Sequence, residues 1–487
     1  MIKFRKVNFQ YKNKEDEFAI KNINLDIKAG ECVLICGVSG CGKTSICRMI
    51  NGIIPNYIKG DLSGEIIIKG KSAHELDMVE RANFIGSVFQ NPKTQFFNNN
   101  VESEIAFTSE NMGVPSKSIR GQVEKQILDF ELEGLRNKLL HQMSGGEKQR
   151  VACAAASAME QKLVVLDEPS SNLDYDSIKK LSLILKKWKE QGKTIIISEH
   201  RLYFLKDIVD KVYIIDKGEV KAYFTGEDFS KLLDCKLNEM GLRSLLPMQI
   251  KVDIKKSLYL SSIQIKNLEV KYHKNLALNI SDFLMKWKGV CAIVGENGAG
   301  KSTFINAISG LVKSKKGKIM INDKVYSAKE LPKNSYIVSQ NVTHQLFADS
   351  VYEEIACTQN IKEDEIIRLL KELNLYDKKD MHPMALSGGE KQRLAIAVAL
   401  AIDKRIIFFD EPTSGLDFYN MQKTARLINE LSLQGKMVFV ITHDIEFIRS
   451  ACSHILHIEA GKIKQDFSLE GDYTKQLTNI FERNSYE

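Results

Sequence analysis

The 487-residue sequence lacks long apolar runs. No window reaches the roughly 18 consecutive apolar residues that a membrane-spanning helix requires, and the first ten residues, MIKFRKVNFQ, contain no apolar segment of a secretion signal. The sequence therefore predicts a cytosolic chain, unless partners hold it elsewhere.

Clustered charge of one sign is also scarce. The 69 basic and 62 acidic residues are mixed along the chain, and their net charge of +7 is a weak indication of nucleic-acid binding. The densest basic stretch, Lys313 to Lys318, aligns with Asp61 to Gly64 of the first half, and we expect a solvated hairpin turn at both places. We therefore expect no nucleic-acid partner.

None of the nine cysteines follows the spacing of zinc ligands. We expect the cysteines instead to be small buried side chains of a protein in a reducing compartment. With 44% hydrophobic and 27% charged residues, the composition is that of a globular protein without long disordered tracts.

What the sequence does contain is one ordered set of motifs that occurs twice. Ser144 and Ser387, Asp167 and Asp410, and His200 and His443 are each 243 residues apart. Such a regular internal repeat implies duplicated domains. The paired motifs are GVSGCGKT (37–44) with GENGAGKS (295–302), Gln90 with Gln340, MSGGEKQR (143–150) with LSGGEKQR (386–393), LVVLDEP (163–169) with IIFFDEP (406–412), and SEH (198–200) with THD (442–444).

The length also favours two α/β domains, which we assign to residues 1–243 and 244–487. A connecting segment from about Thr225 to Ser261 is partly helical by pattern, around Phe229 to Met240. Each half opens with an alternating strand, and a helical lobe is expected between the glycine-rich loop and the SGGE motif, at 101–107 and 119–130 in the first half. Short apolar runs predict buried parallel strands at 33–36, 163–166, 194–197, 292–294, 406–409 and 438–441.

The spacing GxxxxGK[ST] after a buried strand indicates a phosphate-binding loop. Its glycines let backbone N–H groups surround phosphates; they are Gly37, Gly40, Gly42, Gly295, Gly298 and Gly300. Lys43 or Lys301 is expected to reach the β- and γ-phosphate oxygens. Thr44 or Ser302 supplies a hydroxyl oxygen to Mg²⁺.

Acidic pairs at the ends of two apolar strands suit metal binding and hydrolysis. Asp167 and Asp410 are placed to hold the Mg²⁺ shell opposite the phosphate loop. Glu168 and Glu411 follow immediately, where a carboxylate can orient and polarise the attacking water. The alternative is a salt bridge at a strand end.

The SGGE motif predicts a helix start with a capping box. Two glycines in the first turn expose N–H groups at the positive end of the helix dipole, which makes an anion site. We expect each helix start to meet the γ-phosphate bound by the other half. The residues concerned are Ser144, Gly145, Gly146, Ser387, Gly388 and Gly389.

Other residues that occur at matched positions in both halves are also expected to contact the nucleotide. His200 and His443 are placed to contact the γ-phosphate, and Gln90 and Gln340 to sense metal and water. Tyr11 and Tyr272 are candidates for stacking on adenine, with a buried strand-end aromatic as the alternative for both.

Taken together, these motifs resemble those of ATP-binding cassette (ABC) ATPases across nearly the whole chain, and SGGEKQR is the most specific of them. The resemblance implies two tandem P-loop NTPase domains, each a RecA-like core with a helical subdomain, that use ATP and Mg²⁺. It implies a head-to-tail sandwich, in which Lys43 shares a nucleotide with Ser387 and Lys301 shares one with Ser144. Because both halves keep the glutamate and the histidine, we expect two hydrolytic sites.

The segments after the two glutamines, VFQNPKTQFFNNNVESEIAF and IVSQNVTHQLFADSVYEEIAC, resemble those of bacterial and archaeal energy-coupling factor importers of vitamins and transition-metal ions. The resemblance implies two partners, a transmembrane coupling subunit and a small membrane-embedded substrate-binding subunit, and a peripheral position at the cytoplasmic face of the membrane. Three pairs lie 250 residues apart, like the glutamines themselves: Gln95 and Gln345, Phe97 and Phe347, and Glu104 and Glu354. The second copy departs from the FQNP pattern, so the halves are expected to contact the membrane partner unequally.

Three other functions fit a tandem ATPase. One is a soluble ATPase that acts on ribosomes, but the connecting segment here is neither long nor strongly charged. Another is the tandem ATPase of sugar importers, but its signature differs from SGGEKQR and one of its two sites is commonly degenerate. DNA-repair relatives carry zinc modules, for which this chain has no cysteine framework.

Overall fold

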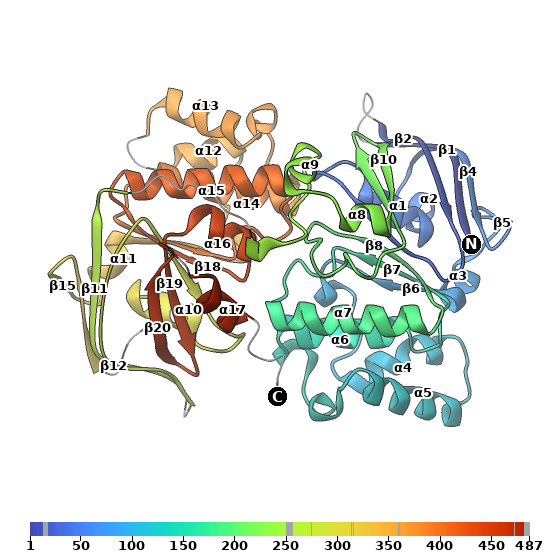
Figure 1. Ribbon diagram of the computed structural model, residues 1–487, viewed down its shortest axis with the longest axis horizontal. Helices are drawn as coiled ribbons and strands as arrows, with labels where there is room; N and C mark the ends of the chain where they lie inside the picture. The colour runs from blue at the N-terminus through green and yellow to red at the C-terminus, as the bar shows by residue number, and fades with distance from the viewer. Residues whose placement is uncertain are drawn as a thin grey trace. The chain divides into compact units, whose positions relative to one another are not determined.

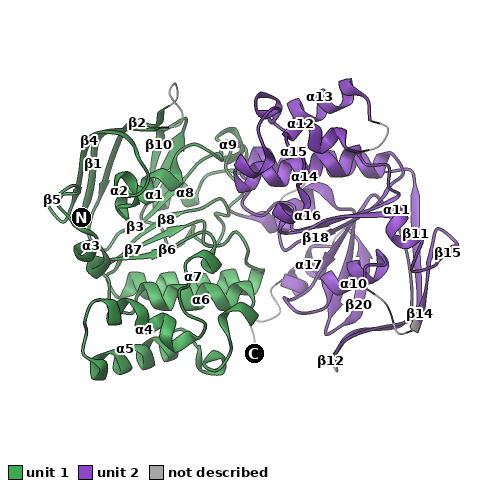
Figure 2. Ribbon diagram, turned by 180° about the vertical axis from the view of Figure 1, so that it is seen from behind, with its two compact units in different colours: residues 1–245 green, residues 246–487 purple. Residues whose placement is uncertain are grey.

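The computed structural model describes residues 1–12, 18–249, 257–273, 275–312, 314, 316–358, 361–471 and 473–481. The chain divides into two compact units, residues 1–245 and 246–487 (Figure 2). Within the expected connecting segment, two short helices, α8 (Gly226–Ser230) and α9 (Asp234–Glu239), confirm the helical pattern. Residues 250–256 of that segment lie outside the described residues.

Unit 1 contains a six-stranded sheet in the order β10-β9-β3-β8-β7-β6. All neighbouring strands are parallel except β9 and β10. This confirms the predicted parallel strands of the first half. The strands are β3 (Cys32–Cys36), β6 (Ile85–Val88), β7 (Leu163–Asp167), β8 (Thr194–Ser198), β9 (Lys211–Asp216) and β10 (Glu219–Thr225).

Both faces of this sheet are buried, which explains its continuous apolar strands. Alternate residues of β3 enter different cores: Leu34 and Cys36 pack with the helices on one face, and Val33 and Ile35 pack with the strands and helix on the other. Helices α6 and α7 cover the first face, and α4 and α5 lie on their far side as the predicted helical lobe (Figure 1). The helices of unit 1 that precede α8 are α1 (Lys43–Ile50), α2 (Ile53–Asn56), α3 (Met78–Phe84), α4 (Val101–Asn111), α5 (Ser116–Asp129), α6 (Gly145–Ala156) and α7 (Tyr175–Glu190).

A second, antiparallel sheet in unit 1 has the order β2-β1-β4-β5. It corrects one prediction, because Asp61 to Gly64 do not form a turn. They belong to β4, whose backbone pairs with β1, with Leu62 opposite Phe9. The strands are β1 (Ile2–Tyr11), β2 (Phe18–Ile27), β4 (Gly60–Ile68) and β5 (Lys71–Ser72).

Unit 2 repeats this arrangement with two sheets, ordered β16-β17-β18-β13-β19-β20 and β12-β11-β14-β15. Its basic stretch is likewise no simple turn, because residues 316–318 belong to β14, while Lys313 and Lys315 lie outside the described residues. The strands are β11 (Leu260–Tyr272), β12 (Asn275–Lys288), β13 (Val290–Val294), β14 (Lys316–Ile321), β15 (Lys324–Tyr326), β16 (Ser335–Val338), β17 (Ile406–Asp410), β18 (Met437–Ile441), β19 (His454–Glu459) and β20 (Lys462–Ser468).

The helices of unit 2 follow the order of unit 1, except that α16 (Ile445–Ala451) follows β18 at a place where unit 1 has turns, at residues 203–208. They are α10 (Lys301–Ile308), α11 (Leu331–Asn334), α12 (Val351–Ala356), α13 (Glu363–Glu372), α14 (Gly388–Ala401), α15 (Phe418–Leu433), α16 (Ile445–Ala451) and α17 (Thr474–Phe481). Throughout the described residues, no helix combines the length and the apolar character needed to cross a membrane.

Candidate active site

Parallel strands bring the repeated motifs to one edge of each large sheet. In unit 1 the glycine-rich loop follows β3, Asp167 ends β7, and His200 comes two residues after β8. These three strands are neighbours and run in the same direction. Their carboxyl ends therefore meet, which is where open α/β sheets bind ligands.

The backbone of the phosphate loop requires glycine. Gly37 and Gly42 have φ values of 148° and 110°. A Cβ atom on Gly37 would lie 2.0 Å from the carbonyl oxygen of Ile215, and one on Gly42 would lie 2.7 Å from that of Ala19. Gly40 also has a positive φ, and in unit 2 so do Gly295, Gly298 and Gly300. A side chain at Gly37 or Gly42 would therefore force backbone to move, whereas at Gly40 and Gly298 only the positive φ favours glycine.

The lysine of each loop is buried and turns back into the loop. The Nζ of Lys43 donates to the carbonyl oxygens of Gly37 and Val38, at 3.0 and 3.1 Å. In unit 2, Lys301 Nζ donates to the carbonyl oxygen of Gly295 at 2.6 Å. Each ammonium thus lies inside the curve of the loop, where phosphate oxygens held by the loop amides would meet it.

The hydroxyl and the carboxylate expected to hold Mg²⁺ lie together in both units. Thr44 Oγ1 donates to Asp167 Oδ1 at 3.2 Å, and Ser302 Oγ donates to Asp410 Oδ2 at 3.4 Å. Burial raises the pKa of both aspartates. A divalent cation would offset that effect by favouring the ionised carboxylates, and hydroxyl and carboxylate oxygens are ligands that Mg²⁺ prefers. The residues present therefore fit Mg²⁺.

The two glutamates share an unusual backbone conformation. Glu168 and Glu411 have φ values of 45° and 52°, in the left-handed region that non-glycine residues rarely adopt. Strain of this kind is characteristic of functional sites. In unit 1, Gln90 Nε2 donates to Glu168 Oε2 at 2.7 Å, and His200 Nε2 lies 3.3 Å from Glu168 Oε1. Glutamine, glutamate and histidine therefore form one cluster around a carboxylate that can polarise a water molecule.

Unit 2 holds the same groups less tightly. His443 Nε2 lies 3.8 Å from Glu411 Oε1, which is longer than a hydrogen bond. Gln340 is exposed and lies two residues after β16, and Gln90 is likewise exposed two residues after β6, so exposure does not distinguish the two glutamines. The two candidate sites are thus alike in composition and different in geometry.

The SGGE motifs start helices, as predicted. Ser144 caps α6, and Glu147 completes the capping box by accepting from the Ser144 N–H at 2.6 Å. Ser387 and Glu390 do the same for α14. Although burial opposes it, hydrogen bonds from Lys138 and from Ser144 hold the pKa of Glu147 below its usual value. The four glycines, Gly145, Gly146, Gly388 and Gly389, form the first turns of the two helices.

The two candidate adenine-stacking tyrosines have different surroundings. Tyr11 shares a 2.7 Å hydrogen bond with Ser45 of α1, and its ring meets Phe9 edge to face. Tyr272 is 44% exposed at the end of β11. Tyr11 thus lies next to the helix that follows the phosphate loop, and stacking on adenine stays a prediction for both residues.

A buried polar scaffold displays one aromatic ring after β6. Gln95 Nε2 donates to the carbonyl oxygen of Ser87 at 2.9 Å, and its Oε1 accepts from the N–H of Phe89. Glu104 Oε2 accepts from the N–H of Phe97 at 3.0 Å. Glu104 is buried, whereas the side chain of Phe97 is 76% exposed and stacks on the half-buried ring of Phe107.

The same scaffold recurs in unit 2. Gln345 bonds to the carbonyl oxygen of Ile337 and to the N–H of Ser339, at 2.7 and 2.9 Å. Glu354 Oε2 accepts from the N–H of Phe347 at 2.8 Å, and Phe347 is 80% exposed. The chain therefore uses a buried glutamate twice to fix a loop that presents an exposed phenylalanine.

The sequence pattern of the family described as ABC transporter matches residues 20–171 and 278–414, which together are more than half of the chain. The chain belongs to the ABC transporter family. A "Putative ABC transporter ATP-binding protein" of Treponema denticola is 42% identical over 96% of this chain and 97% of its own length. The "Putative HMP/thiamine import ATP-binding protein YkoD" of Bacillus subtilis is 30% identical over 94% of this chain and 89% of its own length.

Likeness to solved structures supports the ABC fold. A chain in a model of ribosome-bound archaeal Pelota and ABCE1 matches with a TM-score of 0.71, at 22% identity, over 98% of this chain and 80% of that chain. The predictions of a duplicated P-loop fold and of an ATPase are therefore confirmed. As a family, ABC transporter ATPases bind ATP and work with membrane partners.

One hydrogen-bond partner of Asp167 in unit 1 could not be found by comparing the two halves of the sequence. Ser198 Oγ donates to Asp167 Oδ1 at 2.5 Å and so helps to orient the carboxylate. The residue 243 positions later is Ile441, which has no hydroxyl. A comparison of the halves thus hides this contact, because it exists in one of them.

The residues beside the two histidines also differ between the units. In unit 1, buried Glu199 accepts from the N–H of Ser170, and Arg201 Nη1 donates to the carbonyl oxygen of Leu173 at 3.1 Å. In unit 2 the corresponding residues are Thr442 and Asp444. The mismatch was visible in the sequence as SEHR against ITHD, but only the structure shows that Arg201 ties the histidine loop to the loop before α7.

Proposed function

We propose that this chain is the motor subunit of an energy-coupling factor type importer for a vitamin or a transition-metal ion. ATP binding draws the two units together, closure moves a separate transmembrane subunit, and hydrolysis reopens the pair. A small membrane-embedded subunit binds the cargo. The observation that carries the proposal is the pair of exposed phenylalanines, Phe97 and Phe347, each fixed by a buried glutamate.

Two further facts support this role. Exposed aromatic rings on a rigid support are typical anchors of protein interfaces. The relative from Bacillus subtilis carries a name that refers to import of HMP and thiamine. The chain would then lie at the cytoplasmic face of a bacterial or archaeal membrane, held there by its partners.

The nucleotide is proposed to bind at the two phosphate loops. Lys43 and Lys301 would contact its β- and γ-phosphates. Asp167 and Asp410 would hold Mg²⁺, which supplies charge neutralisation at the phosphates when it is bound. The hydroxyls of Thr44 and Ser302 would complete its protein ligands, and Gln90 and Gln340 would lie close to it.

Each chemical step is assigned to residues of this chain. Glu168 and Glu411 would accept hydrogen bonds from the attacking water and orient it toward the γ-phosphate. His200 and His443 would hold both the glutamate and the γ-phosphate. In unit 1, Gln90 and His200 contact the two carboxylate oxygens of Glu168 and so orient that carboxylate.

The head-to-tail pairing is part of the proposal. Ser144 would meet the nucleotide held by Lys301, and Ser387 the one held by Lys43, each through the exposed N–H groups of its helix start. We expect Ser144→Arg to impair chiefly the site that contains Lys301, because the added bulk lies at the shared face. Single-site nucleotide trapping measures this, with Ser387→Arg as the mirror control. Loss at Lys43 in the Ser144 variant would contradict the pairing.

The importer role is tested by mass spectrometry of what co-purifies from native cells in mild detergent. We expect an integral membrane scaffold together with a small hydrophobic subunit. The double variant Phe97→Ser plus Phe347→Ser should lose both while still binding ATP, and Tyr57→Ser, which removes another exposed aromatic ring, should retain them. Recovery of ribosomes without a membrane protein would instead favour the translation-factor alternative.

A further inference from the structure

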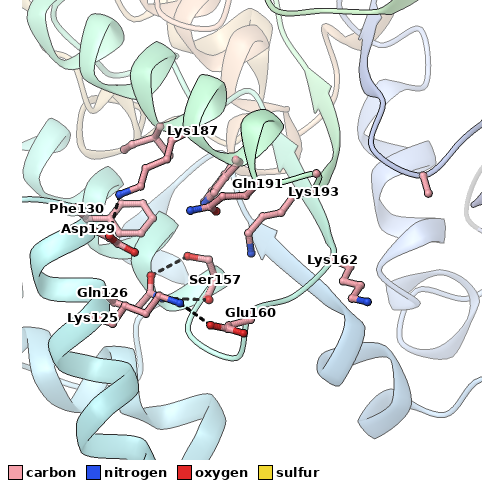
Figure 3. Close-up of a pocket in the computed structure, with 14 residues that line it drawn as sticks. Lys125, Gln126, Asp129, Phe130, Ser157, Glu160, Lys162, Lys187, Gln191 and Lys193 are labelled. Atoms are coloured by element: carbon pink, nitrogen blue, oxygen red, sulfur yellow. Dashed lines mark hydrogen bonds and ion pairs between the residues drawn. The ribbon is translucent and has the colours of Figure 1, made fainter.

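Unit 1 contains an open cavity of about 610 Å³ (Figure 3). Its lining includes no residue of the phosphate loop. Its walls come from helix α5 of the helical lobe, from the C-terminal part of α7, and from the residues just before β7 and β8. Four lysines and two acidic residues line it, so its formal charge is positive. They are Lys125, Lys162, Lys187, Lys193, Asp129 and Glu160.

The two carboxylates are already engaged by two of the lysines. Lys125 Nζ lies 2.5 Å from Glu160, and Lys187 Nζ lies 2.8 Å from Asp129. Lys193 Nζ donates to a backbone carbonyl, that of Gln161, at 2.8 Å. An excess of positive charge therefore remains in the cavity, and an anion would reduce the repulsion among the ammonium groups.

Part of the cavity wall consists of two buried polar side chains that are hydrogen-bonded to each other. Gln126 and Ser157 are both buried, and Ser157 Oγ donates to Gln126 Oε1 at 3.0 Å. At the positions 243 residues later, unit 2 has Leu369 and Leu400, which pack in the apolar core of its own lobe. This polar pair is thus a feature that the duplication does not share.

We propose that this cavity binds a small organic polyanion that carries carboxylate or phosphate groups. The volume lies in the usual range for small-molecule sites, about 300–1,000 Å³. Lysines on several walls can each donate charge-assisted hydrogen bonds to such a ligand. The ring of Trp188, which also lines the cavity, adds an apolar surface. An occupant would bridge the helical lobe and the sheet core of unit 1.

The chain offers its own reporter for this site, because it contains only two tryptophans, Trp188 and Trp287. The full-length protein, with both phosphate loops saturated by a non-hydrolysable ATP analogue and Mg²⁺, is titrated at fixed ionic strength. One series uses propane-1,2,3-tricarboxylate and the other uses fructose 1,6-bisphosphate, which separates carboxylate from phosphate ligands. Calorimetry measures binding, and tryptophan fluorescence locates it.

We expect at least one probe to bind saturably and to change the fluorescence of the wild type but not that of Trp188→Phe. The double variant Lys162→Gln plus Lys187→Gln should raise the dissociation constant at least about tenfold, since it removes two positive charges from the walls. The control, Lys186→Gln plus Arg405→Gln, removes the same charge from exposed positions outside the cavity and should change it less than about twofold.

Two results would overturn the proposal. One is the absence of saturable binding of both probes by calorimetry and by fluorescence. The other is an equal loss of affinity in the cavity variant and in the control, because bulk charge would then explain the binding. Retained binding of the ATP analogue shows that each variant is folded.

Discussion

The second glycine of the SGGE motif should tolerate alanine in one unit and not in the other. A Cβ atom on Gly146 would lie 2.0 Å from Oγ and 2.7 Å from Cβ of Ser177 on α7. Rotation of the hydroxyl relieves only the first clash, so α6 and α7 must separate. In unit 2 a Cβ on Gly389 would meet nothing closer than Arg393 and Leu416, both at 3.8 Å.

The expected magnitudes follow from this packing. Overpacking of a well-packed contact costs about 1–3 kcal/mol, so Gly146→Ala should lower the free energy of unfolding of unit 1 by that amount. Gly389→Ala removes the flexibility of a helical glycine without a clash, and should stabilise unit 2 by up to about 1 kcal/mol. With a urea dependence of about 3 kcal/mol/M, the first change lowers the unfolding midpoint by roughly 0.3–1 M.

Urea unfolding followed by tryptophan fluorescence measures both changes separately. Trp188 lies in unit 1 and Trp287 in unit 2, and each is 3% exposed. A Trp287→Phe background therefore reports on unit 1, and a Trp188→Phe background reports on unit 2. Equal stability changes for the two alanine variants would refute the reasoning.

A rescue variant isolates the contact with α7. Ser177→Gly removes both atoms that a Cβ on Gly146 would meet, so it should cost less stability in the Gly146→Ala background than in the wild type. The difference is the coupling energy between the two positions. A coupling energy of zero would show that the clash is relieved by another route.

Three further predictions concern catalysis, thiols and acid. Glu168→Gln plus Glu411→Gln should leave ATP binding intact and lower turnover at least about 10²-fold, because a positioned catalytic group is lost; near-normal turnover would remove both from that role. A thiol reagent at pH 8 should label Cys235 and Cys357 rapidly and the other seven cysteines only after denaturation, since those seven are buried; fast labelling of more than two would contradict the packing. Folding lowers the pKa of Glu147, so its ionised carboxylate stabilises unit 1 at pH values above 4.5, the ordinary pKa of a glutamate. This stabilisation is lost as the pH falls through the pKa that Glu147 has in the folded protein. In urea unfolding, Glu147→Gln should thus cost less than about 1 kcal/mol at pH 7 and progressively less as the pH is lowered below 4.5. A difference that does not change with pH would argue against ionisation as the cause.

Much of the fold could be read from local patterns. Alternation in β1 and the short apolar runs of β3, β7 and β8 are properties of neighbouring residues, so the sequence predicts them directly. The capping boxes of α6 and α14 are local for the same reason. The turn predicted at Asp61 to Gly64 was wrong because its polar residues pair with a strand some 50 positions earlier.

Contacts across the fold could not be predicted in this way. The hydrogen bond from Gln90 to Glu168 joins residues 78 positions apart, and that from Ser198 to Asp167 joins neighbouring strands. Neither follows from spacing, because each depends on which strands lie next to each other. The exposure of Phe97 is another such result, since it depends on the buried carboxylate of Glu104.

The sequence by itself determined that the chain carries two copies of a phosphate-binding and hydrolytic motif set, because motif order and spacing are linear properties. Only the tertiary structure decided how the side chains of each copy are packed and how closely they approach one another. The strained glutamates, the closer cluster in unit 1, the tight contact at Gly146 and the lysine-lined cavity all arise from side chains that packing brings together. Burial and distance set the energies of these contacts, and both depend on the whole fold.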